Sequence, residues 1–389
     1  MKEVILYSPG AYQAYGHSFD YSKGLSEAFY NLGYTVHVFG IDGPLQFPEF
    51  VNEKRTRKNT NPQKKKTLFE KLRWGFKRLF DSNRILNDFT KFYGNFENRP
   101  LVIFETFEYF SLAKTVAPFS NNYFCVFHDT NFNFQHTSLI AGLYKQFAKI
   151  PAKKIVKNSI RSFVHGAEMK KNFIHQMGAK YAQKIEEIPY GAPNPLQITS
   201  SEKVLSREKI QLEKDKKYLL SFGTLRSDKE YEPILSALKS KTDWVWIIAG
   251  PEGDYSYNDI LEKGKKEKVE ERILTFPKFI KNDEQRLFFT AADVVINLYK
   301  PFIRHESGTA QLARTYNVPV IVSGPPDLTE YVSKKNIGWV VNEKLSVAKV
   351  LGTFESLDQK EKTIILDNIR TLALKNSWSS VVNRILSFT

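Results

Sequence analysis

Short apolar runs alternate with amphipathic helical stretches along most of this 389-residue chain. The first example is an apolar run over 4–8, a Gly-containing turn, a helical stretch over about 17–32 and a second apolar run over 36–39. Apolar runs bounded by turns predict buried strands, and a strand–helix–strand succession predicts parallel pairing. A chain of this length exceeds one ordinary core. The expected fold class is therefore α/β, with two Rossmann-like, doubly wound domains.

The alternation restarts after a stretch rich in proline, serine and charge, which we interpret as an interdomain linker over 193–217. The predicted domains are 1–192 and 218–370, facing a central cleft. A C-terminal helix over 371–389 is expected to cross back to the first domain. The first turn lacks the GxGxxG pattern, so a dinucleotide site is not predicted.

A basic insert over about 52–99 interrupts the pattern. It carries fourteen basic and five acidic residues, which is nine of the fifteen net positive charges. Within it, 67–80 has an apolar arc of about 120°. The arc is formed by Leu68, Phe69, Leu72, Phe76, Leu79 and Phe80. The residues outside it that we assign to a membrane or acceptor surface are Lys71, Arg73, Trp74, Lys77 and Arg78.

A basic amphipathic helix with aromatic residues is typical of proteins that lie on an anionic membrane surface. The alternative is a surface helix docked on its own core with a solvated basic face. Nucleic acid is not the predicted partner, because the aromatic residues are grouped on the apolar face and not interleaved as a stacking platform.

The compartment expected is the cytoplasm, with a peripheral position on the inner face of the membrane. No signal peptide or membrane-spanning stretch is evident in the sequence. The single cysteine, Cys125, excludes a disulfide within the chain and is predicted to be a core residue. The histidines and the cysteine show no metal-ligand spacing, so neither a metal nor another cofactor is expected.

Two loop–helix junctions in the second half are candidate anion sites. In the first, Ser307 is placed to cap a helix that begins at Gly308 and Thr309, with Glu306 before it. Free N–H groups at a helix start bind anions, and glycine allows a ligand close to the backbone. The alternative is an ordinary capped helix.

The second junction follows a predicted strand and contains Gly223, Arg226 and Lys229. In the first half, His128 and Asp129 follow the strand 123–127, at the edge of a parallel sheet where ligands bind. The alternative for His128 is a hydrogen-bonded histidine at a strand end.

In order and spacing, these motifs resemble the retaining nucleotide-sugar glycosyltransferases of the GT-B fold called family 4. The resemblance covers most of the chain outside about 50–98. Its motifs are Gly16-His17, His128, 163–165, 188–191, 223–229, 291–294 and 306–321, with Val318-Pro319-Val320-Ile321 the most recognisable.

The sequence departs from this family at three positions. The family usually carries two glutamates with seven residues between them, and Arg314 stands where the second would be. The glutamate expected to hold the ribose falls near Leu312, which accepts no hydrogen bond. Thr224 replaces the phosphate-binding arginine, although Arg226 lies two residues further along.

The resemblance implies a hexosyltransferase that uses a nucleoside-diphosphate sugar and a glycan or lipid-linked acceptor, in bacterial surface polysaccharide or glycolipid assembly. The first domain would bind the acceptor and the second the donor. Glu306 would position the sugar, and His128 would contact sugar or acceptor. Asp129 would be a base if the reaction inverts configuration.

The remaining roles follow from the same resemblance. Gly16, His17, Gly223, Arg226, Lys229, Ser307, Gly308 and Thr309 would bind the diphosphate end of the donor. Phe276, Lys278 and Phe279 would line a base pocket, or be core residues. The alternatives are a nucleotide-sugar 2-epimerase, suggested by Ser307-Gly308, and a non-catalytic partner subunit, suggested by Thr224 and the missing second glutamate.

Overall fold

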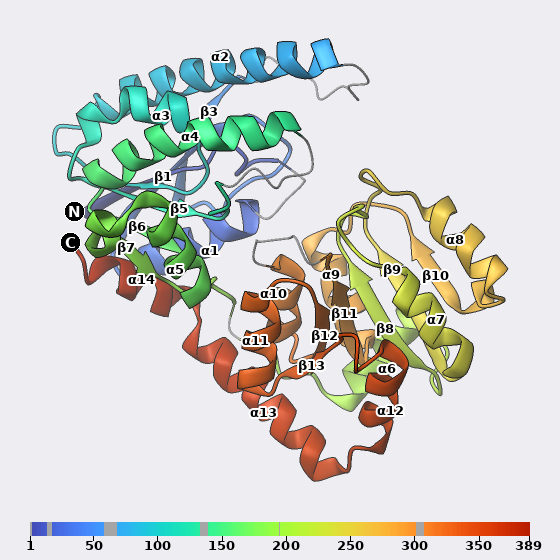
Figure 1. Ribbon diagram of the computed structural model, residues 1–389. Helices are drawn as coiled ribbons and strands as arrows, with labels where there is room; N and C mark the ends of the chain where they lie inside the picture. The colour runs from blue at the N-terminus through green and yellow to red at the C-terminus, as the bar shows by residue number, and fades with distance from the viewer. Residues whose placement is uncertain (1, 14–17, 58–67, 133–138, 194, 301–306) are drawn as a thin grey trace. The chain divides into compact units, whose positions relative to one another are not determined.

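The computed structural model describes the chain except for residues 1, 14–17, 58–67, 133–138, 194 and 301–306. It divides into two compact units, unit 1 (residues 1–191 and 378–389) and unit 2 (residues 192–377). Each unit contains a parallel β-sheet flanked by helices (Figure 1). The α/β fold with two Rossmann-like sheets is confirmed.

The described strands of unit 1 form one parallel sheet in the order β3-β2-β1-β4-β5-β6-β7. The strands are β1 (Lys2–Tyr7), β2 (Tyr34–Ile41), β3 (Val51–Thr56), β4 (Leu101–Phe104), β5 (Tyr123–Phe127), β6 (Arg161–Val164) and β7 (Ile185–Glu187). The helices are α1 (Ser18–Asn31), α2 (Leu68–Tyr93), α3 (Tyr109–Thr115), α4 (Leu139–Asn158), α5 (Ala167–Met177) and α14 (Trp378–Leu386). Because the order reverses between β1 and β4, ligands are expected at the carboxyl ends of these strands.

The central strands β1, β4 and β5 are largely apolar, because helices bury both faces of the sheet there. One face of the sheet packs against α2, α3, α4 and α5, and the other face packs against α1 and α14. Helix α14 is held by Trp378, whose ring lies against Gly24 of α1 and against Gly191. A Cβ atom at either glycine would lie 2.1 Å from that ring. Cys125 is buried in the core of unit 1, as predicted.

The basic segment over 52–99 differs from the prediction of an insert that interrupts the pattern. Its residues 52–56 belong to β3, which pairs in parallel with β2. The amphipathic helix predicted over 67–80 continues as α2 to Tyr93, and Leu86 and Phe89 are fully buried in the core. The segment therefore adds a strand and a helix to the unit, because the apolar positions of α2 beyond residue 80 pack on the sheet.

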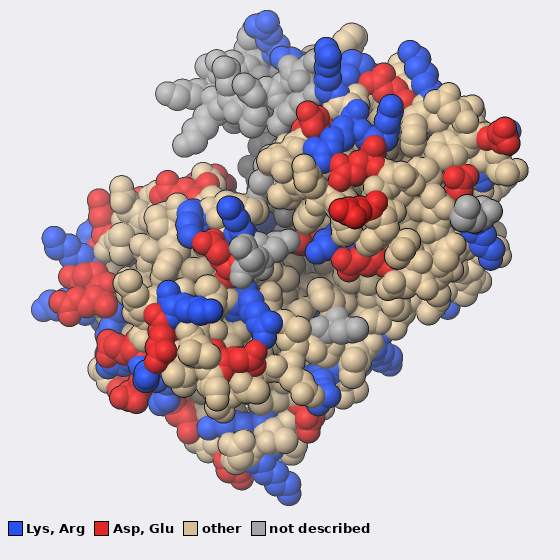
Figure 2. All heavy atoms as spheres, turned by 180° about the vertical axis from the view of Figure 1, so that it is seen from behind, with Lys and Arg blue, Asp and Glu red and all other residues tan. Residues whose placement is uncertain are grey.

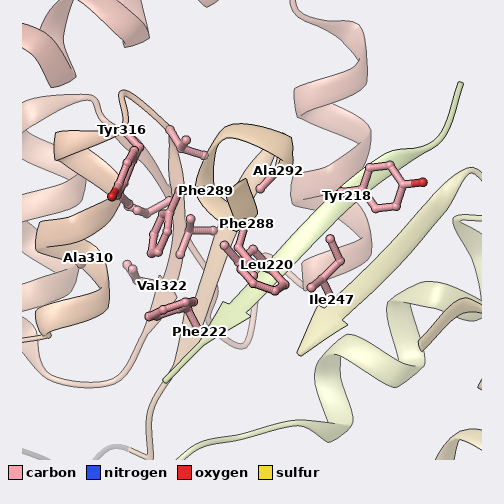
Figure 3. Close-up of a cluster of buried hydrophobic side chains, with 14 of the residues drawn as sticks. Tyr218, Leu220, Phe222, Ile247, Phe288, Phe289, Ala292, Ala310, Tyr316 and Val322 are labelled. Carbon is pink, nitrogen blue, oxygen red and sulfur yellow. The ribbon is translucent and has the colours of Figure 1, made fainter. Parts of the chain in front are cut away.

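The described strands of unit 2 repeat this topology without a counterpart of β7, in the order β10-β9-β8-β11-β12-β13. Its strands are β8 (Lys217–Phe222), β9 (Trp244–Ala249), β10 (Ile273–Phe276), β11 (Val294–Leu298), β12 (Val320–Ser323) and β13 (Gly338–Val340). Its helices are α6 (Ser200–Lys209), α7 (Glu232–Ser240), α8 (Tyr257–Lys266), α9 (Asn282–Ala291), α10 (Gly308–Thr315), α11 (Pro326–Lys335), α12 (Val347–Ser356) and α13 (Gln359–Lys375). Figure 3 shows Leu220 and Phe222 of β8 beside Phe288 and Phe289 of α9 in the core between sheet and helices.

The segment predicted as a linker, 193–217, contains α6 and belongs to unit 2. Thr199 and Glu202 form a capping box at its start. Arg207 of α6 is buried and donates to Asp293 at 2.8 Å, and Lys203 lies 2.6 Å from the same carboxylate. Sequence composition misses this helix because its charges, which suggest a linker, are used in ion pairs with the rest of the unit.

Candidate functional site

In unit 2 the turn after β8 adjoins the first turn of α10. Gly223, which follows β8, has a φ of 92°, a conformation that favours glycine. The Thr309 hydroxyl donates to the carbonyl oxygen of Phe222 at 3.1 Å. Strands β8 and β11 are neighbours at the point where the strand order reverses, and α10 follows β11. The two predicted junctions therefore lie together, at the expected ligand edge of the sheet.

Ser307 caps α10 as predicted, with its hydroxyl accepting from the Ala310 N–H at 3.2 Å. The buried Asn297 side chain donates to the same hydroxyl oxygen, and Tyr299 lies 3.4 Å from it. A Cβ atom at Gly308 would have no described atom within 4 Å. Hydrogen bonds therefore hold the helix start, and no described atom fills the space beside Gly308, as a site that binds an anion on N–H groups requires.

Lys229 supplies positive charge to the loop that follows β8. Its backbone bridges to Tyr299, which contacts the Ser307 cap. In the described part of the chain, no carboxylate forms an ion pair with Lys229, and desolvation followed by repulsion from Arg226 lowers its pKa to about 8. Arg226 itself donates from Nη2 and Nε to Asp228 at 2.6 and 3.0 Å. A phosphate close to Lys229 would favour its charged form and raise this pKa.

The predicted base-pocket residues lie in three different environments. The ring of Phe276 packs edge-on against Phe288, 4.8 Å away, and joins the unit 2 core. Lys278 forms an ion pair with Glu284 at 2.7 Å. Phe279 is 43% exposed. Of these, Phe279 has the surface position that a nucleobase could cover.

Three predicted site residues, Gly16, His17 and Glu306, lie outside the described residues. Arg314, at the position of the family's second glutamate, is buried on α10 and donates to the Tyr331 hydroxyl of α11 at 2.8 Å. Leu312 packs against the core of unit 2. The ribose contact of the family therefore has no counterpart at either of these two positions.

In unit 1, His128 follows β5 and lies in an aromatic group. Its ring is 4.9 Å from that of Tyr21 and 5.1 Å from that of His165, which follows β6. Asp129 forms an ion pair with Lys145 of α4 at 2.6 Å, and its other carboxylate oxygen accepts from the Asn131 N–H at 2.8 Å. These contacts give Asp129 a structural task in its loop, and any role as a base competes with them.

The sequence analysis missed Glu105, which directly follows β4 at the switch point of the first sheet. Its side chain is 1% exposed and accepts a hydrogen bond from the Ser22 hydroxyl of α1. Burial raises the pKa of Glu105 to about 8. Burial and, to a smaller extent, the charge of Glu105 raise the pKa of Tyr21, and the Tyr21 ring contacts His128, so this carboxyl belongs to the surroundings of His128. The position itself, one residue after a strand at the switch point, was the available signal.

The residues predicted to face a membrane lie on the first half of α2. Arg73, Lys77 and Arg78 are exposed, whereas the side chains of Lys71 and Trp74 lie outside the described part. No helix among the described residues is long and apolar enough to span a membrane. Within the same residues, no cluster of histidine, cysteine or carboxylate side chains is arranged to hold a metal ion.

Residues 203–363 match the family model described as glycosyl transferases group 1. The fold resembles that of sucrose-phosphate synthase from Thermosynechococcus elongatus, with 16% identity, 100% and 98% of the two chains covered and a TM-score of 0.75. WaaG, a glycosyltransferase involved in lipopolysaccharide biosynthesis, has 15% identity, 98% coverage of both chains and a TM-score of 0.64. Anabaena HepE, solved in complex with UDP and glucose, has 13% identity, 100% and 99% coverage and a TM-score of 0.67. No curated protein matches the sequence.

Proposed function

We propose, from the premise that this chain is a glycosyltransferase of the GT-B fold with a group 1 domain in unit 2, that it transfers a hexose from a nucleoside-diphosphate sugar to a glycan or lipid-linked acceptor. Unit 2 would bind the donor and unit 1 the acceptor. HepE has been solved with UDP and glucose and with UDP-glucose, which supports a UDP-sugar as the first donor to test. The involvement of WaaG in lipopolysaccharide biosynthesis supports a role in surface polysaccharide or glycolipid assembly.

The observation that carries the proposal is that Tyr299 joins Lys229 to the start of α10, through a backbone bridge to Lys229 and a hydroxyl 3.4 Å from that of Ser307. Transfer breaks the bond between the anomeric carbon and a diphosphate oxygen, so negative charge builds up on the leaving group. Oriented N–H groups and a nearby cation stabilise such charge. The N–H groups at Gly308 and Thr309 and the ammonium group of Lys229 would do so, with Gly223 allowing the phosphates to approach the backbone.

The sugar end of the donor would be positioned by Glu306, with Gly16 and His17 near the diphosphate. His128 would contact the sugar or the acceptor hydroxyl. Phe279 would cover the base, with Phe276 and Lys278 beside it. The buried Arg314 means that the ribose must be held by other groups than the family's second glutamate.

The test is release of nucleoside diphosphate from a panel of UDP-, GDP- and ADP-sugars, with Glu306→Ala and Lys229→Ala in parallel. Ser227→Ala is a matched control, because Ser227 lies in the same loop as Lys229 and its hydroxyl donates to Asp254, which follows β9. We expect release from one donor, a loss of at least about a hundredfold in both site variants and near-parental rates in the control. A Glu306→Ala variant as fast as the parent would overturn the site. Donor binding without release would favour the epimerase, and absence of binding the non-catalytic partner.

A further inference from the structure

Helix α4 presents an apolar stripe at its surface that sequence patterns do not reveal. Leu143, Phe147 and Ile150 are spaced as one side of a helix, and Phe147 and Ile150 are 65% and 76% exposed. On another side of α4, Ala148 and Ile155 are fully buried in the core of unit 1. The exposed stripe is therefore additional to the face that holds α4 on its sheet, and clustered exposed apolar residues mark contact surfaces.

A second apolar stripe lies on the first half of α2. Phe76 and Phe80, one turn apart, are 73% and 75% exposed, although Leu86 and Phe89 in the second half of α2 are fully buried. Helix α3 contacts both α2 and α4. Figure 1 shows α2 and α4 running along the same side of the sheet. We call the exposed residues Phe76, Phe80, Leu143, Phe147 and Ile150 the α2–α4 surface.

The two helices that carry this surface are strongly basic. Helix α4 has five lysines and no acidic residue, and α2 has six basic and three acidic residues. Arg73, Lys77 and Lys154 are exposed. On the face drawn in Figure 2, by comparison, basic and acidic side chains are interspersed.

We propose that the α2–α4 surface docks on an anionic lipid bilayer, with its phenylalanine and isoleucine side chains among the acyl chains and the neighbouring lysines and arginines at the headgroups. Exposed apolar side chains flanked by basic ones have the chemistry that such an interface binds. The proposal deepens the proposed function and rests on it for its purpose, because a lipid-linked acceptor would be met at the same interface.

Two other occupants fit the surface less well. A second copy of the chain would bring two strongly basic helix pairs against one another, and this like-charge contact opposes association. Nucleic acid would satisfy the charge, but Leu143 and Ile150 offer no ring on which bases can stack. An anionic bilayer satisfies the charge and the apolar side chains together.

The experiment is co-sedimentation of the full chain with vesicles of phosphatidylcholine alone and with about a third phosphatidylglycerol. Three double variants are compared with the parent: Phe147→Ser with Ile150→Ser, Phe76→Ser with Phe80→Ser, and Ile364→Ser with Leu374→Ser. The last pair is the matched control, since these residues are 45% and 50% exposed on α13 of unit 2. Circular dichroism confirms folding, and light scattering gives the oligomeric state.

We expect the parent and the control to bind the anionic vesicles, and each α2 or α4 pair to lower vesicle affinity at least about tenfold. Undiminished binding of the α4 pair, absence of parental binding, or a dimer that the α4 pair dissociates would each overturn the proposal. Release of nucleoside diphosphate from the soluble donor is measured on the same samples without vesicles. A protein that releases nucleoside diphosphate but binds no vesicles would support the proposed function and overturn the docking surface. A protein that binds vesicles but releases no nucleoside diphosphate would support the docking surface and count against the proposed function.

Discussion

The hydroxyl group of Thr309, in the first turn of α10, donates to the carbonyl oxygen of Phe222 at the end of β8 across 3.1 Å and 87 positions of sequence. This bond joins the helix start to the Gly223 turn. The nearly isosteric Thr309→Val removes it, and one such bond contributes about 1 kcal/mol to the free energy of unfolding. We expect a small fall in melting temperature together with a clear loss of affinity for nucleoside diphosphate. Both quantities are measured by calorimetry. A change in melting temperature with unaltered affinity would contradict a role in the site.

Donor binding should depend on the protonation of Lys229. Desolvation and Arg226 lower the pKa of this ammonium group to about 8, so it is charged below that pH and loses its charge above it. A bound diphosphate favours the charged form, so binding near pH 8 should take up a proton. We expect affinity for nucleoside diphosphate to fall about tenfold from about pH 7 to about pH 9.5.

The control for this titration is Lys229→Arg, whose guanidinium stays charged over the whole range. Its pH profile should be flat in the same calorimetric measurement. A parental profile that is equally flat would show that Lys229 does not contact the phosphates.

The buried Glu105 predicts that stability falls as pH rises. Burial raises the pKa of this carboxyl from 4.5 to about 8, so between these values the folded protein holds a proton that the unfolded chain has lost. Its unfavourable contribution therefore develops between about pH 5 and about pH 8 and is constant above. Each pKa unit corresponds to about 1.4 kcal/mol, so the effect amounts to a few kcal/mol.

Glu105→Gln should remove this part of the pH dependence, because the amide keeps a group that accepts from Ser22 and does not ionise. Chemical unfolding at about pH 5 and about pH 8.5 should show a larger gain for the variant at the higher pH. An equal difference between parent and variant at both values would mean that the carboxyl does not titrate in this range.

The docking of α14 should be sensitive to one methyl group. Trp378 fills the space beside Gly24, where a Cβ atom would lie 2.1 Å from its ring. Gly24→Ala is expected to lower the free energy of unfolding by about 1–3 kcal/mol, because an overpacked core must shift. Gly75→Ala, where a Cβ atom meets nothing within 4 Å, is the control and should not destabilise α2. Thermal unfolding followed by circular dichroism distinguishes the two.

The sequence by itself determined the features that depend on neighbouring residues. The alternation of strands and helices, the cap at Ser307, the glycine turn at Gly223 and the start of α10 were predicted because period, capping and turn chemistry act over a few positions. The expected α/β class followed from the order of these local elements, and the GT-B fold was implied by the resemblance of the motifs to a known family. The proposed roles of the site residues stay predictions.

Only the tertiary structure decided which distant residues meet and which stay exposed. It placed Glu105 on Ser22 and turned Arg314 onto Tyr331. It buried Phe89 of α2 and left Phe80 at the surface, although both belong to one amphipathic helix. A helical period gives the angle of a side chain around its axis but not where the sheet beneath the helix ends, so exposure along α2 and α4 depended on strand order and helix placement.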